Sequence, residues 1–457
     1  MIKTLIRRFN ILGGLFKGDQ NKSAPKQVQK SIPSIERNSY QAKVLFTTLP
    51  NKSSILTESG GFPTSVHLGL LLTLGTKHES EACQGFLTSF QQSFLYKLSS
   101  ASTSFLHSTR PSINFSFNQE SSVLSSYSLA QDTEKLLNIM FSCLTQPYED
   151  LHDSIIQGKT QYFLDHTHKF DLHHWIQSIV MNHCLTGGLG NYPYTQKDIK
   201  ISGKDLNAFM NQHLWGNRLT LFAAGVYNHK EFVELASPLL SKFNSQSEDH
   251  NEKPNCYTPV RVKIEQDLPF NYYSLCFPGP SYSSSLYWHF QLLSDIYSRS
   301  FNSPSSLFFH KLANPSTDIS EISSFLHNFS QIGLFSINCL GSNEHGREIF
   351  TTLAKSMILL ENISENDFLL AKNTLKLDLF LKYEETGKRI EEYAKHFAFT
   401  GKVLEMKNVF NEIDKISLDE FRKIVRELID ADVSIISLGS NLDKMPSIEH
   451  MKELVSN

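Results

Sequence analysis

Two patterns of hydrophobic spacing follow one another early in the chain. From Val66 to Gly75, apolar residues alternate with small or polar ones, which predicts a half-buried strand. From about Glu81 to Leu98 they recur at three- and four-residue steps, which predicts an amphipathic helix with one buried face. The apolar positions of this helix are Phe86, Leu87, Phe90, Phe94 and Leu98.

The same two patterns continue to the C-terminus. Strands are expected at residues 40–49, 113–117, 123–129, 218–226, 272–277, 333–339 and 433–439. Helices are expected at residues 131–144, 205–214, 229–243, 284–297, 307–312, 345–360, 366–384, 390–400 and 418–428, and residues 148–185 predict one or two long helices. Strands and helices interspersed in this way indicate an α+β fold.

A nearly polar, breaker-rich stretch divides the chain. Residues 244–256 contain Asn, Ser, Asp, Lys and Pro but no apolar run, so we expect a linker there. A helix, a short gap and a buried strand ending in Gly occur at 206–225 and again at 418–439. This repeat indicates a duplicated domain, with halves at 38–243 and 257–457.

Composition narrows the class of protein. Of 457 residues, 40% are hydrophobic and 19% are charged, and the net charge of −3 gives no reason to expect nucleic acid as a partner. No apolar run reaches the roughly 18 residues that a membrane-spanning helix needs. The cysteines, at positions 83, 143, 184, 256, 276 and 339, include no C-x-x-C pair. Scattered cysteines favour free thiols in a reducing compartment over a disulfide framework or a thiolate zinc site.

The N-terminal segment is basic and amphipathic. Between Met1 and Ser31 it carries seven Lys or Arg residues against one acid, Asp19, and apolar residues recur at three- and four-residue steps from Ile2 to Phe16. This composition is typical of a mitochondrial import presequence, which we expect at residues 1–35. A disordered basic tail is the alternative. A secretory signal is not expected, because no continuous apolar core follows the charges.

The helix near residue 90 has the spacing of a zinc site without its ligands. An inverted zinc-peptidase helix carries two His at i and i+4, a Glu base before the second, and a third ligand, Glu, on a downstream helix. Here Ser89 and Ser93 hold the His positions and Gln92 holds the Glu position. Hydroxyls are poor zinc ligands, and an amide cannot take a proton from water. The downstream helix offers Gln157 and Gln161, so no catalytic or metal-binding residue is expected.

One dense group of histidines remains. A metal site there would need a carboxylate such as Asp165 or Asp171 to converge with the imidazoles, and a solvated helix junction is the favoured interpretation. The group consists of His166, His168, His173 and His174. No G-x-S-x-G nucleophile motif is present either.

The order and spacing of these segments resemble the M16 (insulinase-like, pitrilysin-like) metallopeptidase family. Ser89-Phe-Gln-Gln-Ser93 stands where that family has its inverted H-x-x-E-H motif. The other similar segments are Gly190–Tyr194, Asn217–Leu219, Ala223–Val226, Ser300–Leu312, Ala371–Lys376, Ile390–Gly401 and Val433–Gly439. Together they cover nearly the whole chain after the presequence. Within the family they resemble most the non-catalytic, alpha-type subunits of the mitochondrial processing peptidase.

The resemblance implies two homologous halves, each a mostly antiparallel sheet backed by helices, facing each other across a cavity. It implies a heterodimer in which a beta-type partner carries the zinc and this chain holds no cofactor. The pair would bind and remove presequences in the matrix of a mitochondrion or a related organelle. The alternative is a core scaffold subunit of the respiratory cytochrome bc1 complex, associated with the inner membrane. The missing ligands argue against an independently active peptidase.

The resemblance also marks a substrate-binding loop. In alpha-type subunits a glycine-rich loop here would approach an extended peptide, since Gly adopts positive φ at little cost. In this chain the loop consists of Ser300, Phe301, Asn302, Ser303, Pro304, Ser305 and Ser306, with no glycine. Asn, Ser and Pro specify a stiffer turn. A role in binding presequences is therefore implied by position, and a plain connecting loop is the alternative.

Overall fold

The computed structural model describes most of the chain after residue 42. The described ranges are 43–59, 64–80, 84–101, 103–170, 172–191, 200–226, 228–245, 255–298, 319–342, 346–440 and 442. Three expectations from the sequence lie outside them: the presequence at 1–35, the loop Ser300–Ser306 and the helix at 307–312.

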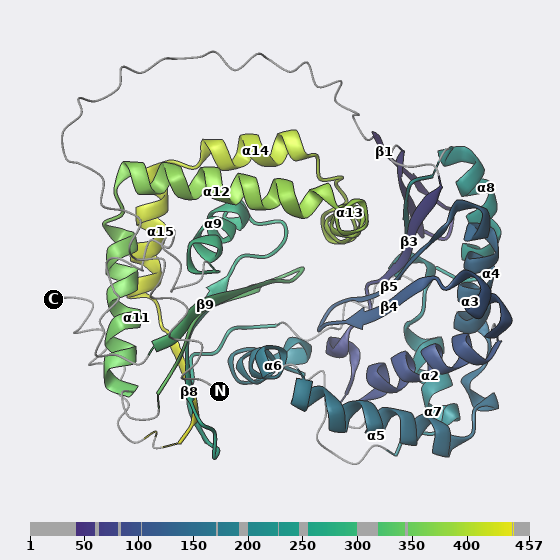
Figure 1. Ribbon diagram of the computed structural model, residues 1–457, viewed down its shortest axis with the longest axis horizontal. Coiled ribbons are helices and arrows are strands. Elements are labelled where there is room, and N and C mark those ends of the chain that lie inside the picture. Colours follow the sequence, from purple (N-terminus) through teal and green to yellow (C-terminus); the bar gives the residue numbers. More distant parts are fainter. Residues whose placement is uncertain are drawn as a thin grey trace, which may run out of the picture. The chain divides into compact units, whose positions relative to one another are not determined.

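Six strands form the first sheet, in the order β1-β2-β6-β3-β5-β4 (Figure 1). The strands are β1 (Lys43–Thr48), β2 (Ser54–Ser59), β3 (Ser65–Leu72), β4 (Ser112–Phe117), β5 (Ser122–Leu129) and β6 (Leu219–Ala224). All neighbouring pairs are antiparallel except β2 and β6, which run parallel. The last strand of this half therefore lies inside the sheet, between strands that come much earlier in the sequence.

Five strands form the second sheet and repeat that order without a counterpart of β1. The order is β7-β11-β8-β10-β9. The strands are β7 (Arg261–Glu265), β8 (Asn271–Gly279), β9 (Ile319–Asn328), β10 (Gly333–Gly341) and β11 (Ser434–Gly439). The last strand again runs parallel to the first strand and antiparallel to the second. The predicted α+β fold, with two homologous and mostly antiparallel halves, is confirmed.

The helices follow the strands in a matching order. The first half contains α2 (Phe86–Ala101), α3 (Thr103–Thr109), α4 (Thr133–Thr145), α5 (Asp153–Phe170), α6 (Leu172–Cys184), α7 (Gly203–His213) and α8 (His229–Leu240). The second contains α9 (Tyr287–Ser298), α11 (Gly346–Glu361), α12 (Glu365–Glu384), α13 (Thr386–Thr400), α14 (Met406–Lys415) and α15 (Leu418–Asp430). In each half, two helices follow the last hairpin and a third comes next, so α6 and α13 take equivalent places. Among the described helices, none combines the length and apolar character needed to cross a bilayer.

The repeated closing unit begins with the same helix cap and ends with a glycine of positive φ in both halves. At the start of α7, Ser202 accepts a hydrogen bond from the amide of Asp205, whose carboxylate reaches back to the Ser202 amide. The start of α15 has the same arrangement. The strands that follow lead into Gly225 and Gly439, with φ of +85° and +137°. Residues with a Cβ rarely adopt such angles, which explains the glycine at both places.

Each sheet packs one face on helices of its own half. In the first half these are mainly α2, α4, α7 and α8, and in the second α9, α11, α12, α14 and α15. Alternating strand residues point to this face, as the sequence pattern predicts.

The opposite face of each sheet is covered by a helix from the other half. Helix α13 places Ile390 and Ala394 against Leu56 and Phe222 of the first sheet, and all four side chains are at most 1% exposed. Helix α6 packs in the same way on the second sheet, where Val180 and its neighbours meet buried residues of β8 and β11. The two halves therefore exchange equivalent helices.

This exchange alters one expectation. Strand β3 is buried on both faces, with Leu70 and Leu71 both at most 2% exposed and His67 at 6%. The prediction of a half-buried strand is wrong because α13 of the other half covers the second face. Alternation within one segment does not reveal a cover that comes from another segment.

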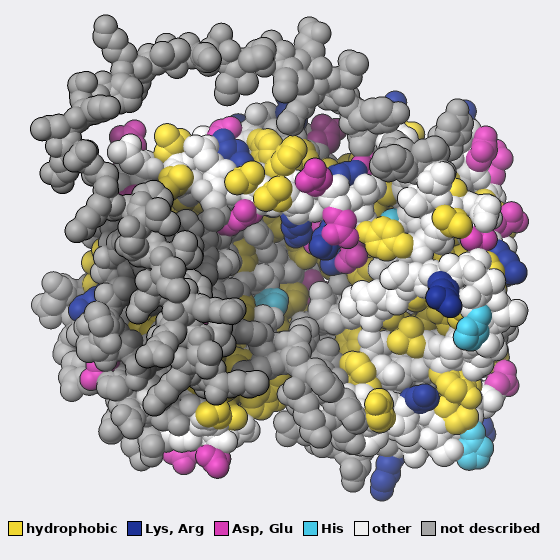
Figure 2. All heavy atoms as spheres, viewed as in Figure 1, with side chains coloured by type: hydrophobic (Ala, Val, Ile, Leu, Met, Phe, Trp, Pro, Cys, Tyr) yellow, Lys and Arg dark blue, Asp and Glu magenta, His cyan; other side chains and the backbone are white. Residues whose placement is uncertain are grey.

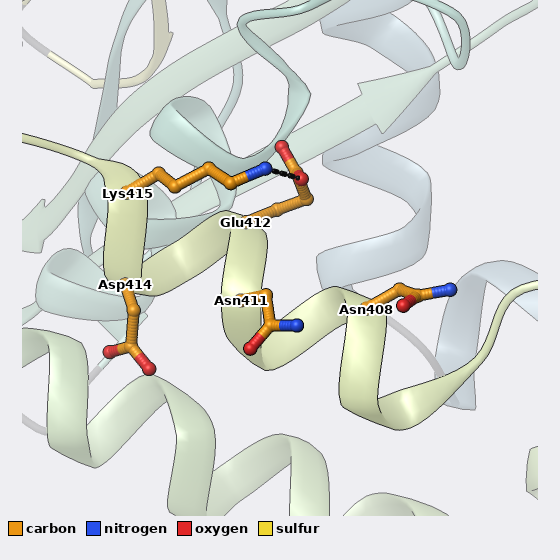
Figure 3. A pocket seen from close by; sticks show the side chains of 5 residues that line it. All are labelled: Asn408, Asn411, Glu412, Asp414 and Lys415. Carbon is orange, nitrogen blue, oxygen red and sulfur yellow. Dashed lines mark hydrogen bonds and ion pairs between the residues drawn. The ribbon is translucent and has the colours of Figure 1, made fainter.

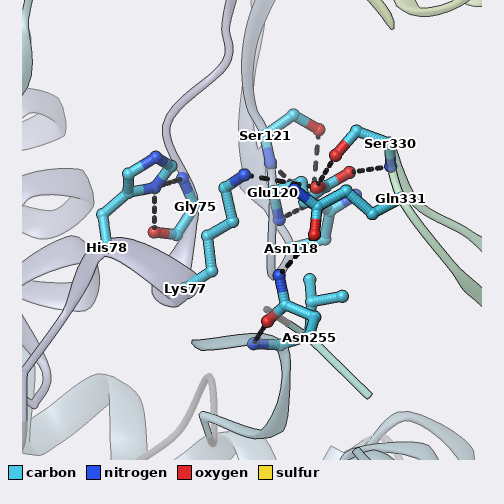
Figure 4. A network of polar contacts seen from close by, with 10 residues as sticks. Gly75, Lys77, His78, Asn118, Glu120, Ser121, Asn255, Ser330 and Gln331 are labelled. Atoms are coloured by element: carbon cyan, nitrogen blue, oxygen red, sulfur yellow. Dashed lines mark hydrogen bonds and ion pairs between the residues drawn. The ribbon is translucent and has the colours of Figure 1, made fainter. Parts of the chain in front are cut away.

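Two equivalent turns also meet between the halves (Figure 4). In the β4–β5 turn, the Glu120 carboxylate accepts hydrogen bonds from the amide and hydroxyl of Ser330, in the β9–β10 turn, at 2.7 and 2.5 Å. Lys77 forms an ion pair with Glu120 at 3.3 Å. The Asn118 side chain accepts from the amides of Glu120 and Ser121 and so shapes the turn. Glu120 is only 2% exposed, so these contacts satisfy a buried charge.

Candidate functional site

Helix α2, which has the spacing of a metal-binding helix, is fixed by aromatic packing. The rings of Phe90 and Phe94 meet Phe115 of β4 edge to face, with centroids 5.3 and 5.6 Å apart. Every apolar position predicted for the helix, from Phe86 to Leu98, is buried. The helix therefore forms part of the core of the first half.

A buried carboxylate caps the start of α2. The Glu79 oxygens accept hydrogen bonds from the amides of Gly85 and Leu87 at 3.1 and 2.7 Å. The Asn191 side chain donates to the carbonyls of Thr76 and Glu79 and holds this segment in place. Burial raises the pKa of Glu79 to about 7, although both amide hydrogen bonds favour the charged form. The carboxylate serves orphan amides of the helix terminus rather than a reaction centre.

Ser89, at the first His position, faces α5 inside the protein. Its hydroxyl accepts a hydrogen bond from Thr160 Oγ1 at 3.2 Å, and both residues are 0% exposed. Thr160 Oγ1 also lies 2.7 Å from the carbonyl oxygen of Ile156. The sequence points to Gln157 and Gln161 as the polar groups of this helix, yet Thr160 is the residue that α5 brings to Ser89. No sequence motif marks it, and only the packing of α2 on α5 identifies it.

Of the other two motif positions, Ser93 is buried and Gln92 is half-buried. Ser93 is 2% exposed, and its hydroxyl has no hydrogen-bond partner among the described residues. The Gln92 amide donates to Gln91 Oε1 at 3.2 Å, and Gln91 in turn donates to the carbonyl of Phe115. The amides of Gln91 and Gln92 are therefore used in local structure, whereas the Ser93 hydroxyl is not.

These residues do not fit a zinc ion. Zinc in proteins is bound by imidazole, thiolate or carboxylate, whereas this position offers the neutral side chains of Ser89, Gln92, Ser93 and Thr160. Among the described residues, no group of three or more His, Cys, Asp and Glu could hold a metal ion. The arrangement supplies neither a base nor a Lewis acid for peptide hydrolysis.

Two other candidates from the sequence lie outside the described residues. The side chains of His166, His168, His173 and His174 belong to a stretch in which only the helical backbone is described. The loop Ser300–Ser306 also lies outside. The solvated helix junction favoured for the histidines and the peptide-binding role of the loop therefore stay predictions.

A surface hollow of about 440 Å³ lies on α14 (Figure 3). One helix supplies all its lining residues: Asn408, Asn411, Glu412, Asp414 and Lys415. Glu412 and Lys415 pair with each other at 2.6 Å, and Asp414 pairs with Lys376 of α12 at 2.8 Å. Charges that already neutralise one another on an open surface do not form a catalytic group.

The fold defines a class: an α+β chain of two similar halves, each with a mostly antiparallel sheet and its own helices. The model of the peptidase M16 inactive domain matches residues 200–375. The chain is therefore similar to the M16 peptidase family.

Relatives along almost the whole chain agree with this assignment. The mitochondrial-processing peptidase subunit beta of Blastocladiella emersonii is 23% identical over 447 residues, covering 91% of this chain and 94% of the relative. The subunit alpha of Solanum tuberosum is 23% identical over 467 residues, covering 96% and 91%. Subunit 1 of the mitochondrial cytochrome b-c1 complex of Caenorhabditis elegans is 22% identical over 440 residues, covering 90% of each. The relatives thus include both peptidase subunits and a respiratory-complex subunit.

A solved structure confirms the fold. A chain of complex III2 from Candida albicans, in a structure with Inz-5 bound, superposes with a TM-score of 0.75 at 16% identity. The superposition covers 90% of the present chain and 100% of the Candida albicans chain. At this identity the match speaks for the fold alone.

Proposed function

We propose that this chain is a non-catalytic subunit of a mitochondrial processing peptidase, of the alpha type. It would recognise presequences and support a zinc-bearing beta-type subunit that removes them in the matrix. The observation that carries the proposal is the Ser89–Thr160 hydroxyl pair, fully buried at the place of the metal. Relatives among both subunits of that peptidase support it.

The same proposal assigns a role to each segment of the chain, including segments outside the described residues. Residues 1–35 would be a mitochondrial presequence, followed by an M16 N-terminal domain at 38–243, a linker at 244–256 and a C-terminal domain at 257–457. The loop Ser300–Ser306 would contact the presequence. Its lack of glycine implies a stiffer contact than a glycine-rich loop would give.

Co-expression with a beta-type M16 subunit that carries an intact H-x-x-E-H motif tests the proposal. Cleavage of a presequence peptide is measured with the partner alone, with this chain alone and with both. We expect cleavage with both, and none with this chain alone at any zinc concentration. Chelator-sensitive cleavage by this chain alone would overturn the proposal. Equal cleavage by the partner subunit with and without this chain would also overturn it.

Deleting Ser300–Ser306 tests the loop in the same assay. We expect a higher KM for presequence peptides with the heterodimer still assembled on a sizing column. Unchanged cleavage would leave the loop a plain connection and sink its proposed role.

The second candidate is a core scaffold subunit of the cytochrome bc1 complex at the inner membrane. It is supported by the similarity to cytochrome b-c1 complex subunit 1 and by the loop without glycine. Affinity purification of the chain separates the two functions. Recovery of a protein with an H-x-x-E-H motif favours processing, and recovery of cytochrome b or c1 favours the scaffold.

A further inference from the structure

Two buried cysteines from different halves of the chain meet where helix α6 packs on the second sheet. Cys184 is the last residue of α6, and Cys276 lies on β8, the central strand of that sheet. Both belong to the apolar cluster between α6 and the sheet, and both are 0% exposed. They lie far apart in the sequence and form no C-x-x-C pair, so only the exchange of α6 brings the two thiols together.

Hydrogen bonds of the backbone fix the end of α6 over β8. The amide of Thr258 donates to the Cys184 carbonyl at 2.9 Å, and Leu185 forms a β-bridge with Tyr257. The Tyr257 hydroxyl in turn donates to the Cys276 carbonyl at 2.7 Å. The positions of both cysteines are therefore set by the same short segment, which follows the linker.

The two side chains are also in direct contact. The Cys184 thiol is hydrogen-bonded to Cys276 and to Ser434, the β11 residue that lies directly opposite Cys276 in the sheet. The Cys276 sulfur lies 3.2 Å from the Ser274 hydroxyl oxygen, which lies 2.7 Å from Asn338 Oδ1. Because the thiols already touch, rotation of the side chains is the movement needed to reach an S–S bond of about 2.05 Å.

The surroundings make the two thiols unequal. The hydrogen bond from Cys276 lowers the pKa of the Cys184 thiol, burial opposes this effect, and the hydrogen bond from Ser434 adds to it. Burial raises the pKa of the Cys276 thiol well above its usual value, and the contact with Cys184 raises it further. Cys184 is therefore the sulfur that ionises first. A thiolate beside a second, protonated thiol is the arrangement in which one sulfur is oxidised and the other resolves the product.

The burial of both sulfurs determines which oxidant fits. Cys184 ends a helix, and the last turn of a helix opens more readily than its interior, so a molecule about the size of water has access. A bulky peptide disulfide does not. The net charge is −3, and Figure 2 shows acidic side chains among the basic ones on its visible face, so the described surface there does not favour an anionic oxidant. The oxidant that fits is a small uncharged hydroperoxide, such as hydrogen peroxide.

We propose that Cys184 and Cys276 form a reversible disulfide that locks α6 to the second sheet when a hydroperoxide is present. The Cys184 sulfur attacks one peroxide oxygen, the O–O bond breaks, and the released hydroxide takes up the proton that the Cys184 thiol lost. The Cys276 sulfur then attacks the Cys184 sulfenic acid, whose hydroxide leaves with the Cys276 proton as water. Two thiols are oxidised by two electrons in total, and one peroxide is reduced to two waters.

The disulfide ties the two halves together covalently. Helix α6 belongs to the first half and β8 to the second, so the bond reinforces the packing by which one half covers the sheet of the other. It also closes a long loop and so restricts the unfolded chain. The lock does not depend on the processing function proposed above, because it requires only α6 in its place on the second sheet.

Peptide mapping of the full chain after treatment with hydrogen peroxide tests the proposal. The remaining thiols are blocked with N-ethylmaleimide in denaturant, and fragments from digestion without reductant are analysed by mass spectrometry. We expect two fragments joined through Cys184 and Cys276, two hydrogens lighter than the separate fragments together, and separated by dithiothreitol. The Tm should rise on oxidation and return on reduction.

Three variants identify the bond. Cys184→Ala and Cys276→Ala should each lose both the joined fragments and the rise in Tm. Cys339→Ala is the matched control, because it removes a thiol that is 1% exposed on β10 of the same sheet but belongs to the cluster on the opposite face. This variant should keep both signals. Each variant is compared with itself, oxidised against reduced, so a lower starting stability does not alter the comparison.

Several results would overturn the proposal. One is a Cys184 thiol that still reacts with N-ethylmaleimide in denaturant after peroxide has fully oxidised Cys256, which is exposed. Another is Cys184 oxidised to sulfinic acid without a link to Cys276. A disulfide between Cys184 and Cys256 would assign a different partner. An equal rise in Tm in wild type and Cys276→Ala would show that the stabilisation has another source.

Discussion

Glu58 of β2 and Arg389 of α13 are separated by 331 positions in the sequence and form a buried ion pair of 2.6 Å. The carboxylate is 1% exposed, and one of its oxygens has no hydrogen-bond partner among the described residues. Burial raises the pKa of Glu58, while the Arg389 guanidinium opposes the rise. Arg389 also donates to the carbonyl of Tyr383. The pair therefore joins the first sheet to the helix that the second half contributes.

Replacing Arg389 by Met should lower the free energy of unfolding by about 3 kcal/mol at pH 7, because a buried carboxylate loses its cation. Thermal unfolding measures the loss. Adding Glu58→Gln to Arg389→Met should recover part of it. Lys423→Met, which breaks a pair whose side chains are 76% and 60% exposed, is the control and should change little. An equal loss of unfolding free energy in Arg389→Met and Lys423→Met would contradict a stabilising role for the Glu58–Arg389 pair.

Glu79 makes stability depend on pH. Its pKa of about 7 in the folded chain exceeds the usual 4.5, so the folded state binds more protons than the unfolded state between these values. Stability contributed by this group is therefore fully present below pH 4.5 and is lost as pH rises through 7. The loss is about 3 kcal/mol.

Unfolding of wild type and Glu79→Gln at pH 5 and pH 8 checks this. In wild type the free energy of unfolding should be higher at pH 5 than at pH 8. Glu79→Gln should remove most of this difference, whereas Glu134→Gln at an exposed position should keep it. A Glu79→Gln variant with the wild-type pH dependence would exclude the carboxyl as its source.

Restoring the motif letters should not restore a zinc site. Ser89→His with Gln92→Glu and Ser93→His inserts imidazoles at positions that are 0% and 2% exposed, and each overpacked site costs about 1–3 kcal/mol. Thr160 stands where α5 meets Ser89, so no carboxylate completes the ligand set.

We expect the triple variant to bind less than stoichiometric zinc by elemental analysis and to unfold at a lower temperature. Ser99→His with Ser100→His, exposed on the same helix, is the matched control for added imidazoles. Stoichiometric zinc together with a raised Tm would show that the metal position is still open.

Glu120→Ala should loosen the contact between the two hairpin turns. It removes the acceptor of the Ser330 amide and hydroxyl and leaves the ammonium of Lys77 without its carboxylate, a loss of about 2 kcal/mol. Hydrogen exchange should accelerate at the Ser330 amide. Glu120→Gln, which keeps an acceptor oxygen, should exchange more slowly than Glu120→Ala. Identical exchange in wild type and both variants would mean that the turns are held by other contacts.

Regular amphipathic segments were predictable from the sequence because their apolar spacing reflects burial against their own sheet. Strand β2 was not predicted because its sequence, Ser-Ile-Leu-Thr-Glu-Ser, contains only two apolar residues, and the cation that pairs with its buried Glu58 is Arg389 of the other half. Helix α14 was missed although Val409 and Ile413 stand one turn apart and are buried, a signal that could have been used.

For the candidate site, too, some features could be predicted from the sequence and others could not. The sequence alone identifies Ser89, Gln92 and Ser93 as side chains that are poor zinc ligands or bases, because ligand chemistry depends on residue type. The hydrogen-bond partner of Ser89 could not be predicted from the sequence. Thr160 is distinguished from other helical threonines only by the packing of α5 on α2. Similarly, the exposed apolar residues of α12, such as Leu370 and Leu377, cannot be distinguished from core residues in the sequence, because exposure is a property of the folded chain.

The exchange of α6 and α13 has a consequence for how such a chain could originate. A polypeptide of one half alone would leave the second face of its sheet open to water. Two identical copies could close both faces by lending each other the helix in the α6 or α13 position, giving a two-fold symmetric dimer. Joining the copies end to end would convert that packing between molecules into the packing within one chain seen here. If the two halves of the present chain separated, each would expose to water the sheet face that the helix of the other half covers.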